Sequence, residues 1–281
     1  MSSATTTKTS VSLQGPRTAR RRPAASGLLL KAGVLLAAGI VWEAAARLFP
    51  SIFVPPLSKV LQHAWTSWSS LDPNATFGTN VFAMILASFS RLVPAIVLAT
   101  LIGLVLGVAI ARIRILDHLL TPVVHFIRAI PSTAKIPIFI ALLGIGDAMK
   151  ISVIVVAALF PFMLNVIHGV KDIHDTTVDV CKVYRINRSD FFLRVLLPGA
   201  LPQIFSGLRL MTMIALIVMV LTEMIGASDG VGYYVLYAER RFLVLDMWAG
   251  VLLLGAMGYL FSFVLNLLEL RLLRWHTAQN S

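Results

Sequence analysis

The sequence predicts an all-α membrane protein with six transmembrane helices and one long helix–turn–helix loop on the cytoplasmic side. Hydrophobic residues make up 58% of the 281 residues and charged residues only 13%, a composition unlike that of soluble domains. Apolar stretches of about 20 residues, enough to cross a bilayer, recur along the chain. Lysines and arginines flank these stretches on the side expected to be cytoplasmic, so the net charge of +11 requires no nucleic-acid partner.

Residues 1–26 are rich in Ser, Thr, Arg and Pro and lack an apolar face, so we expect a disordered basic cytoplasmic tail. A first span should follow at Leu28–Phe49, with its N-terminus held inside by Arg20–Arg22. These arginines could instead begin a twin-arginine or secretory signal, but the apolar run is long and leads into further membrane segments. Residues 27–80 should therefore comprise the first span and an external segment with an interfacial amphipathic helix after Pro55-Pro56.

Residues 81–275 should form the other five spans. We expect Val81–Arg91 to run along the interface into the second span, Leu92–Ala111. Gly103 and Gly107 in this span would permit close contact with another helix, although glycines are also common in membrane helices without such a role.

The third span, Leu119–Leu143, contains three prolines, and such a broken helix is tolerated only against protein or a water-filled cavity. Arg128, Ser132, Thr133 and Lys135 lie beside the expected break. Because a charge in a bilayer usually faces a cavity or a partner, these four residues are a candidate substrate path. The alternative is that Arg128 snorkels to the cytoplasmic interface while Lys135 pairs with an acid.

The remaining spans are expected at Lys150–Val170, Ile204–Met224 and Met247–Leu270, with a polar external loop at Val235–Asp246. Glu223, at the end of the fifth span, could be either a structural partner or part of a gate on the substrate path. Residues 276–281 should form a short cytoplasmic tail, so that both termini share the basic side of the membrane.

The polar loop between the fourth and fifth spans, residues 172–202, is basic and carries two short helical patterns. Val178, Cys181 and Tyr184 recur at helical spacing. Asn187 and Ser189 offer N-caps for a second helix, which Pro198 and Pro202 should end.

This loop resembles the cytoplasmic coupling loop of permease subunits of binding-protein-dependent ABC importers. That family's loop reads Glu-Ala-Ala, three residues, Gly, and about a dozen residues to Leu-Pro. Counted back from Leu197-Pro198, the glycine falls on Arg185 and the Glu-Ala-Ala falls on Asp179, Val180 and Cys181. The segments Pro55–Ser58 and Ile136–Gly146 are similar to permeases of the nitrate, sulfonate and taurine subgroup.

The resemblance implies a type I importer fold and a set of partners. The residues that would couple this chain to a cytoplasmic ATPase subunit are Asp179, Val180, Cys181, Arg185, Leu197 and Pro198. ATP and magnesium would bind that subunit, since this chain has no G-x-x-x-x-G-K-[ST] motif. A second permease copy and an external solute-binding protein would complete a complex in the bacterial inner membrane.

The same resemblance implies import of a small anion or zwitterion such as a sulfonate, taurine or nitrate. A gated channel or secondary transporter without an ATPase is the alternative function. We expect no catalytic residue and no cofactor on this chain. We also expect no metal site, because His168, Asp172, His174 and Asp175 match no standard zinc spacing. The glycine lost at Arg185 predicts that the coupling turn moves to Asn187, which tolerates the left-handed conformation better.

Overall fold

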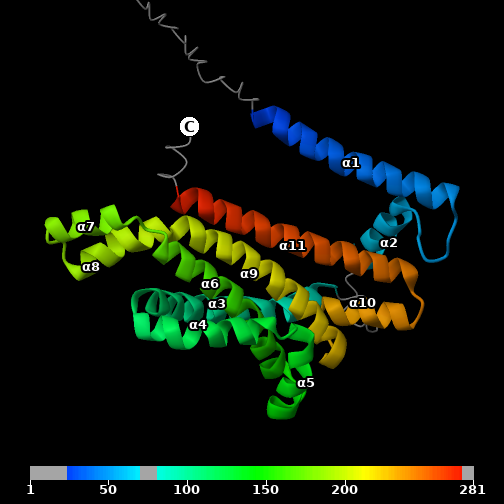
Figure 1. Cartoon of the computed structure of the whole chain (residues 1–281). Coiled ribbons are helices and arrows are strands. Elements are labelled where there is room, and N and C mark those ends of the chain that lie inside the picture. Colours follow the sequence, from blue (N-terminus) through cyan, green and yellow to red (C-terminus); the bar gives the residue numbers. More distant parts are fainter. Residues whose placement is uncertain (1–23, 70–80, 274–281) are drawn as a thin grey trace, which may run out of the picture.

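The computed structural model describes residues 24–69 and 81–273, within which every regular element is helical (Figure 1). The predicted tails therefore lie wholly or mostly outside the described residues, as does the end of the external segment. The elements in chain order are α1 (Ala24–Leu48), α2 (Leu57–Ser69), α3 (Val81–Arg112), α4 (Arg114–Ala129), α5 (Ser132–Leu143), α6 (Asp147–Lys171), α7 (Asp175–Val183), α8 (Arg188–Phe191), a π-helical turn (Phe192–Leu196), α9 (Leu197–Gly226), α10 (Val231–Arg240) and α11 (Val244–Leu272).

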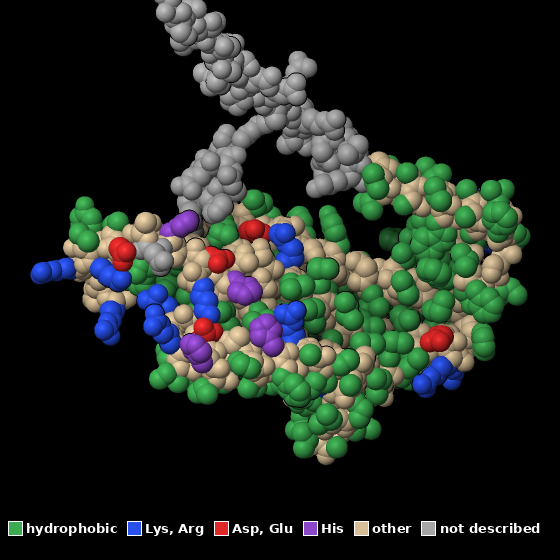
Figure 2. Space-filling model, viewed as in Figure 1, with side chains coloured by type: hydrophobic (Ala, Val, Ile, Leu, Met, Phe, Trp, Pro, Cys, Tyr) green, Lys and Arg blue, Asp and Glu red, His purple; other side chains and the backbone are tan. Residues whose placement is uncertain are grey.

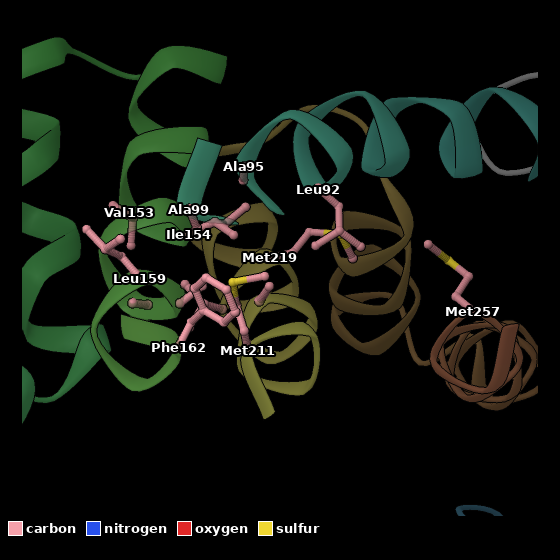
Figure 3. Packing of buried hydrophobic residues seen from close by; sticks show 14 of the residues in the cluster. Leu92, Ala95, Ala99, Val153, Ile154, Leu159, Phe162, Met211, Met219 and Met257 are labelled. Carbon is pink, nitrogen blue, oxygen red and sulfur yellow. The ribbon is translucent and has the colours of Figure 1, made fainter. Parts of the chain in front are cut away.

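The core is built from α3, α6 and α9, with α6 packed extensively against both α3 and α9 (Figures 1 and 3). Phe162 of α6 and Met211 of α9 are fully buried in this core. A Cβ atom at Gly103 would lie 2.6 Å from the Phe162 ring, and one at Gly107 would lie 2.8 Å from Val166. The predicted close helix contact at these two glycines is therefore confirmed.

Four described helical segments are long and apolar enough to cross a membrane: α3, α6, the continuous run Arg188–Gly226, and α11. The α4–α5 pair is a fifth candidate, but its two helices meet at 97°. Pro131 lies at this corner and precedes α5, so the predicted proline break in the third span is confirmed. The count of six spans stays a prediction.

Two predicted boundaries were wrong. Residues 81–91 are not a segment separate from the second span, because α3 is one continuous helix in which Arg91 is buried among carboxylates. Residues 235–246 are not an open loop, since α10 continues to Arg240 and α11 begins at Val244. Asp246 connects α11 to α10 and α2. It accepts a hydrogen bond from the Tyr234 hydroxyl of α10 at 2.7 Å and lies 2.9 Å from His63 Nε2 of α2. Burial, and then the hydrogen bond to Asp246, raise the pKa of Tyr234.

The second helix of the cytoplasmic loop does not end at the prolines, as the sequence analysis expected, but continues into α9. Pro198 lacks an N–H group, and its ring would clash with the carbonyl of Arg194 in a regular α-helix. The π-helical turn Phe192–Leu196 widens the backbone here, with the Leu197 N–H donating to the Phe192 carbonyl. We infer that this wider turn accommodates Pro198, so that α8 and α9 form one continuous helical run.

The hairpin of α7 and α8 projects beyond the core at one end of the molecule (Figure 1). Lysine and arginine side chains gather at this end, whereas much of the rest of the same face is apolar (Figure 2). This distribution agrees with a cytoplasmic position for the hairpin.

Candidate functional site

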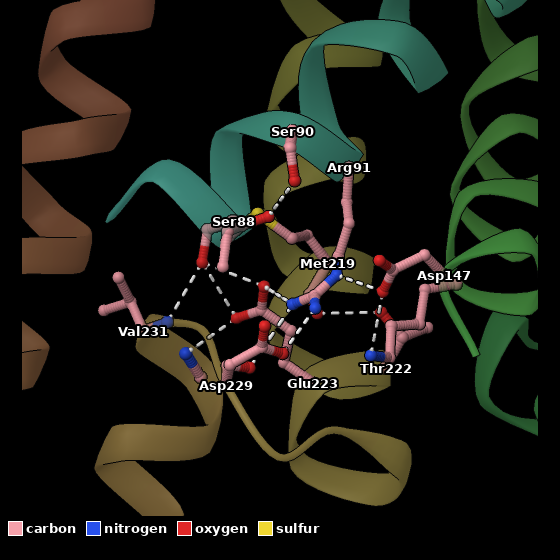
Figure 4. A network of polar contacts seen from close by, with 12 residues as sticks. Ser88, Ser90, Arg91, Asp147, Met219, Thr222, Glu223, Asp229 and Val231 are labelled. Carbon is pink, nitrogen blue, oxygen red and sulfur yellow. Dashed lines mark hydrogen bonds and ion pairs between the residues drawn. The ribbon is translucent and has the colours of Figure 1, made fainter. Parts of the chain in front are cut away.

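A buried arginine organises the end of the core opposite the hairpin (Figure 4). Arg91 of α3 is 2% exposed, and its guanidinium pairs with three carboxylates from different segments. Its Nε donates to Asp147 at 2.7 Å, its Nη1 donates to Glu223 at 3.1 Å, and its Nη2 pairs with Asp229. One side chain therefore joins α3, the start of α6, the end of α9 and the turn before α10.

Glu223 is fully buried, and its carboxylate accepts hydrogen bonds from Ser88 and Gly232 as well as from Arg91. The Ser88 hydroxyl donates to it at 2.8 Å and the Gly232 N–H donates at 2.9 Å. Ser88 in turn accepts the Val231 N–H at 3.0 Å. A buried carboxylate is tolerated when it is paired and hydrogen-bonded in this way. Glu223 thus pairs with Arg91, while its role in a gate on the substrate path stays a prediction.

Two glycines let the backbone of the α9–α10 turn approach Glu223. Gly230 has φ +101°, a conformation that favours glycine, and a Cβ there would lie 2.5 Å from the Glu223 carboxyl group. A Cβ at Gly232 would lie 2.8 Å from the Val220 carbonyl. Larger residues at either position would push the turn away from the carboxylate.

The charged cluster borders a cavity of about 520 Å³ that opens beside the α5–α6 and α9–α10 turns. Asp147 and Asp229 are about half exposed here, while the Lys150 side chain is buried and lies 3.2 Å from Asp147. The cavity is therefore lined by cations and carboxylates together. The network therefore holds four segments together at the edge of an open cavity.

The predicted substrate-path residues lie on both sides of the α4–α5 corner, except for Glu223. Arg128 and Thr133 are exposed, and Ser132 is partly buried at the start of α5. Lys135 is only 7% exposed, and within the described residues its ammonium group forms no ion pair or hydrogen bond. The alternative in which Lys135 pairs with an acid is therefore not what the described structure shows.

Four of the predicted coupling residues lie on α7 or in the turn after it, and the other two begin α9. Asp179 is exposed and bonds Lys182 at 2.9 Å, and Val180 is 54% exposed. Cys181 is instead 7% exposed and faces the inside of the hairpin. Leu197 and Pro198 are partly buried at the start of α9.

The prediction for the coupling turn was wrong. Arg185 itself takes the left-handed conformation, with φ +51°, whereas Asn187 has φ −60° and serves as the N-cap position of α8. The Arg185 N–H donates to the Lys182 carbonyl and the Ile186 N–H donates to the Cys181 carbonyl, both at 3.0 Å. These two bonds form a Schellman motif that fixes the turn at Arg185 whatever side chain stands there. The prediction that Tyr184 shares one helix face with Cys181 was also wrong, because Tyr184 is 77% exposed whereas Cys181 is buried.

The charged network around Arg91 was not predicted from the sequence. A signal was present, because Arg91 interrupts an apolar run and a charge at that depth requires a partner. Asp147 and Asp229 each lie in a glycine-rich turn that ends or begins an apolar helix. What the sequence could not show is that these turns converge on one arginine.

Comparison with known proteins gives one consistent result. The family model described as "Binding-protein-dependent transport system inner membrane component" matches residues 99–275. The taurine transport system permease protein TauC of Escherichia coli (strain K12) is 28% identical over 259 residues, covering 91% of this chain and 93% of that protein. The putative aliphatic sulfonates transport permease protein SsuC of Bacillus subtilis (strain 168) is 29% identical, covering 70% and 72%.

A solved structure supports the fold. An inward-facing structure of the MetNI methionine ABC transporter superposes with a TM-score of 0.61 over 68% of this chain and 95% of that chain, at 18% sequence identity. At this identity the likeness shows the fold alone. The predicted fold class and the family resemblance drawn from the loop are both confirmed.

Proposed function

Since the chain belongs to the family of binding-protein-dependent transport system inner membrane components, we propose that it forms the membrane pathway of an ATP-driven importer for a small anion or zwitterion. The chain moves the solute by alternating access and performs no covalent step itself. ATP hydrolysis takes place on a separate subunit. The channel or secondary transporter considered as an alternative is not supported by this family, whose description includes a binding protein.

The observation that carries the substrate class is Lys135. Most of the Lys135 side chain is buried, no carboxylate neutralises it within the described residues, and charged residues in membrane segments often mark substrate pathways. The group lies one turn into α5, just past the proline corner that a membrane tolerates only beside protein or water. An anionic head group passing this corner would supply the missing countercharge. Arg128 and Thr133, exposed near the same corner, would line the approach.

The names of the relatives favour the same class. TauC and SsuC are named for taurine and for aliphatic sulfonates, which share a sulfonate group. A sulfonate is a permanent anion at neutral pH, and the amino group of taurine makes that molecule a zwitterion. We therefore propose a sulfonate, or another small molecule with a carboxylate or nitrate-like group, as the solute.

The tip of the hairpin supports docking to a cytoplasmic ATPase subunit. Val180, Val183 and Tyr184 are 54–79% exposed and adjoin one another at the end of α7. Adjoining apolar side chains on a projecting element are typical of an interaction surface. Because Cys181 faces inward, we propose that Asp179 and Val180 make the contact, with Arg185 fixing the turn. A second copy of this chain and an external binding protein would complete the complex, with both termini in the cytoplasm.

The test is uptake by proteoliposomes that contain this chain, its ATPase subunit and its binding protein. ATP-dependent accumulation of radiolabelled taurine or an alkanesulfonate, lost when either partner is omitted, is the expected result. Preferential uptake of a cation or a neutral sugar would overturn the substrate class. Uptake that persists without ATP or the ATPase subunit would instead overturn the importer.

A further inference from the structure

A second cavity lies at the opposite end of the molecule, between the hairpin and the core. It measures about 430 Å³ and is bounded by the inner face of α7, the α7–α8 turn, the π-helical turn and the last residue of α3. Three of its lining residues are cations: Arg112, Lys182 and Arg188. No carboxylate belongs to its lining.

These cations are poorly neutralised by the protein. Within the described part of the chain, Arg112 and Arg188 form no ion pair, and Arg112 instead stacks over the Phe191 ring at 5.2 Å from its centroid. Lys182 bonds Asp179, but both groups are mostly exposed, so this pair is weak. The next acid along the loop, Asp190, pairs with Arg194 outside the cavity. The cavity therefore has a positive field that calls for an anion.

The remaining lining is apolar, with Val178, Ile186 and Phe192 among its residues. Arg112 ends α3, a helix long and apolar enough to cross the membrane, and basic residues at the cytoplasmic end of such a helix are typical neighbours of phospholipid head groups. A free phosphate would satisfy the cations but not the apolar walls. A phospholipid satisfies both, because its phosphodiester and its glycerol and acyl groups meet a basic and an apolar surface together.

We propose that this cavity is a binding site for the head group of an anionic phospholipid from the inner leaflet. Arg112 and Arg188 bind the phosphate, and the apolar residues contact the upper part of the acyl chains. A lipid in this position joins α3 to the hairpin. Its occupancy would therefore affect how firmly the hairpin is held against the core.

Cys181 provides a reporter for the site. It is the only cysteine of the chain, it is 7% exposed, and it lines this cavity. The experiment uses the full chain in nanodiscs of phosphatidylcholine, with or without phosphatidylglycerol, and measures the rate at which a small maleimide modifies Cys181. We expect phosphatidylglycerol to slow the modification. Arg112→Gln with Arg188→Gln should abolish this protection, since each basic residue near a membrane surface changes lipid affinity about five-fold.

The control variant is Arg114→Gln. Arg114 lies two residues after Arg112 at the same end of the molecule but does not line the cavity, so the variant should keep the protection. Equal protection in all variants would mean a general surface effect and would overturn the site. Equal protection by soluble glycerol phosphate in neutral nanodiscs would overturn the lipid assignment in favour of a free phosphate.

Native mass spectrometry gives a second readout that does not depend on thiol access. The wild-type chain and Arg114→Gln should retain bound phosphatidylglycerol after extraction, and the Arg112→Gln/Arg188→Gln variant should not. Equal retention by all three proteins, or no retention by any, would contradict the proposal.

Discussion

At the residue scale, the end of the molecule opposite the hairpin is held together by Arg91. Its guanidinium neutralises the fully buried Glu223 and contacts two further carboxylates, Asp147 and Asp229, that are about half exposed. These ion pairs should contribute differently to the free energy of unfolding. Losing the partner of a buried charge is strongly destabilising, whereas an exposed charge that loses its partner is solvated by water. The contact with Glu223 should matter most and the contact with Asp229 least.

Arg91→Gln should therefore destabilise the protein strongly, by about 3–5 kcal/mol, since it leaves Glu223 buried without a countercharge. The measurement is the thermal unfolding midpoint of the purified protein in detergent. The double variant Arg91→Gln/Glu223→Gln should recover part of the loss, and Asp229→Asn should change little. A double variant no more stable than Arg91→Gln alone would contradict this role for Glu223.

Arg185 shows how a lost glycine leaves strain in the backbone. A left-handed conformation disfavours residues with a Cβ by about 1–2 kcal/mol, yet Arg185 keeps φ +51° because the two Schellman hydrogen bonds require it. Arg185→Gly should therefore stabilise the hairpin, and amide hydrogen exchange in α7 should slow about five-fold or more. Lys182→Gly, within the helix, should speed exchange instead, because glycine lowers helix stability by about 1 kcal/mol. Faster exchange in Arg185→Gly would show that the arginine side chain holds the turn.

Charged residues within apolar segments could be recognised from the sequence, but the residues that pair with them could not. Lys135 and Glu223 were identified because charges in apolar segments are rare and need a reason. Arg91 was placed at an interface because only its neighbours in sequence were visible. Its partners lie 56 to 138 residues further along the chain, and no local pattern brings such residues together.

At the scale of elements, α3 and α6 pack closely because glycines replace side chains where the helices meet. Gly107→Leu should prevent that approach, since a Cβ there would already lie 2.8 Å from Val166. We expect destabilisation of about 1–3 kcal/mol or more, measured by the unfolding midpoint in detergent. Gly255→Leu in α11 is the matched control, because nothing lies within 4 Å of its added Cβ. Equal effects of the two changes would mean that leucine itself, rather than crowding, is responsible.

Hydropathy predicted where the long helices lie, but it did not predict reliably where they end. Pro131 marked a true corner, because no helix on either side continued through it. Pro198 and Pro202 looked like the same signal but lie inside a continuous run, because a π-helical turn accommodates Pro198. The local sequence does not distinguish these cases, since tertiary packing decides whether a helix bends or stops.

At the scale of the whole molecule, two regions with different chemistry lie at opposite ends of one packed core. The Arg91 network joins four segments at the end beside α10, and the basic hairpin projects at the other (Figure 1). Helices α3, α6 and α9 connect these two regions. The family and fold class could be predicted from the loop and the hydropathy. The second permease copy expected from the resemblance stays a prediction, because its contacts would be made by another chain.

The measurement that tests the central claim most directly is the initial rate of ATP-dependent sulfonate uptake by proteoliposomes containing Lys135→Gln. Lys59→Gln, which alters an exposed lysine on α2, is the matched control. We predict that Lys135→Gln lowers uptake at least ten-fold, while the affinity of the external binding protein for the solute and the docking of the ATPase subunit stay unchanged. Lys59→Gln should transport normally. Normal uptake by Lys135→Gln would contradict a path for anions at the α4–α5 corner.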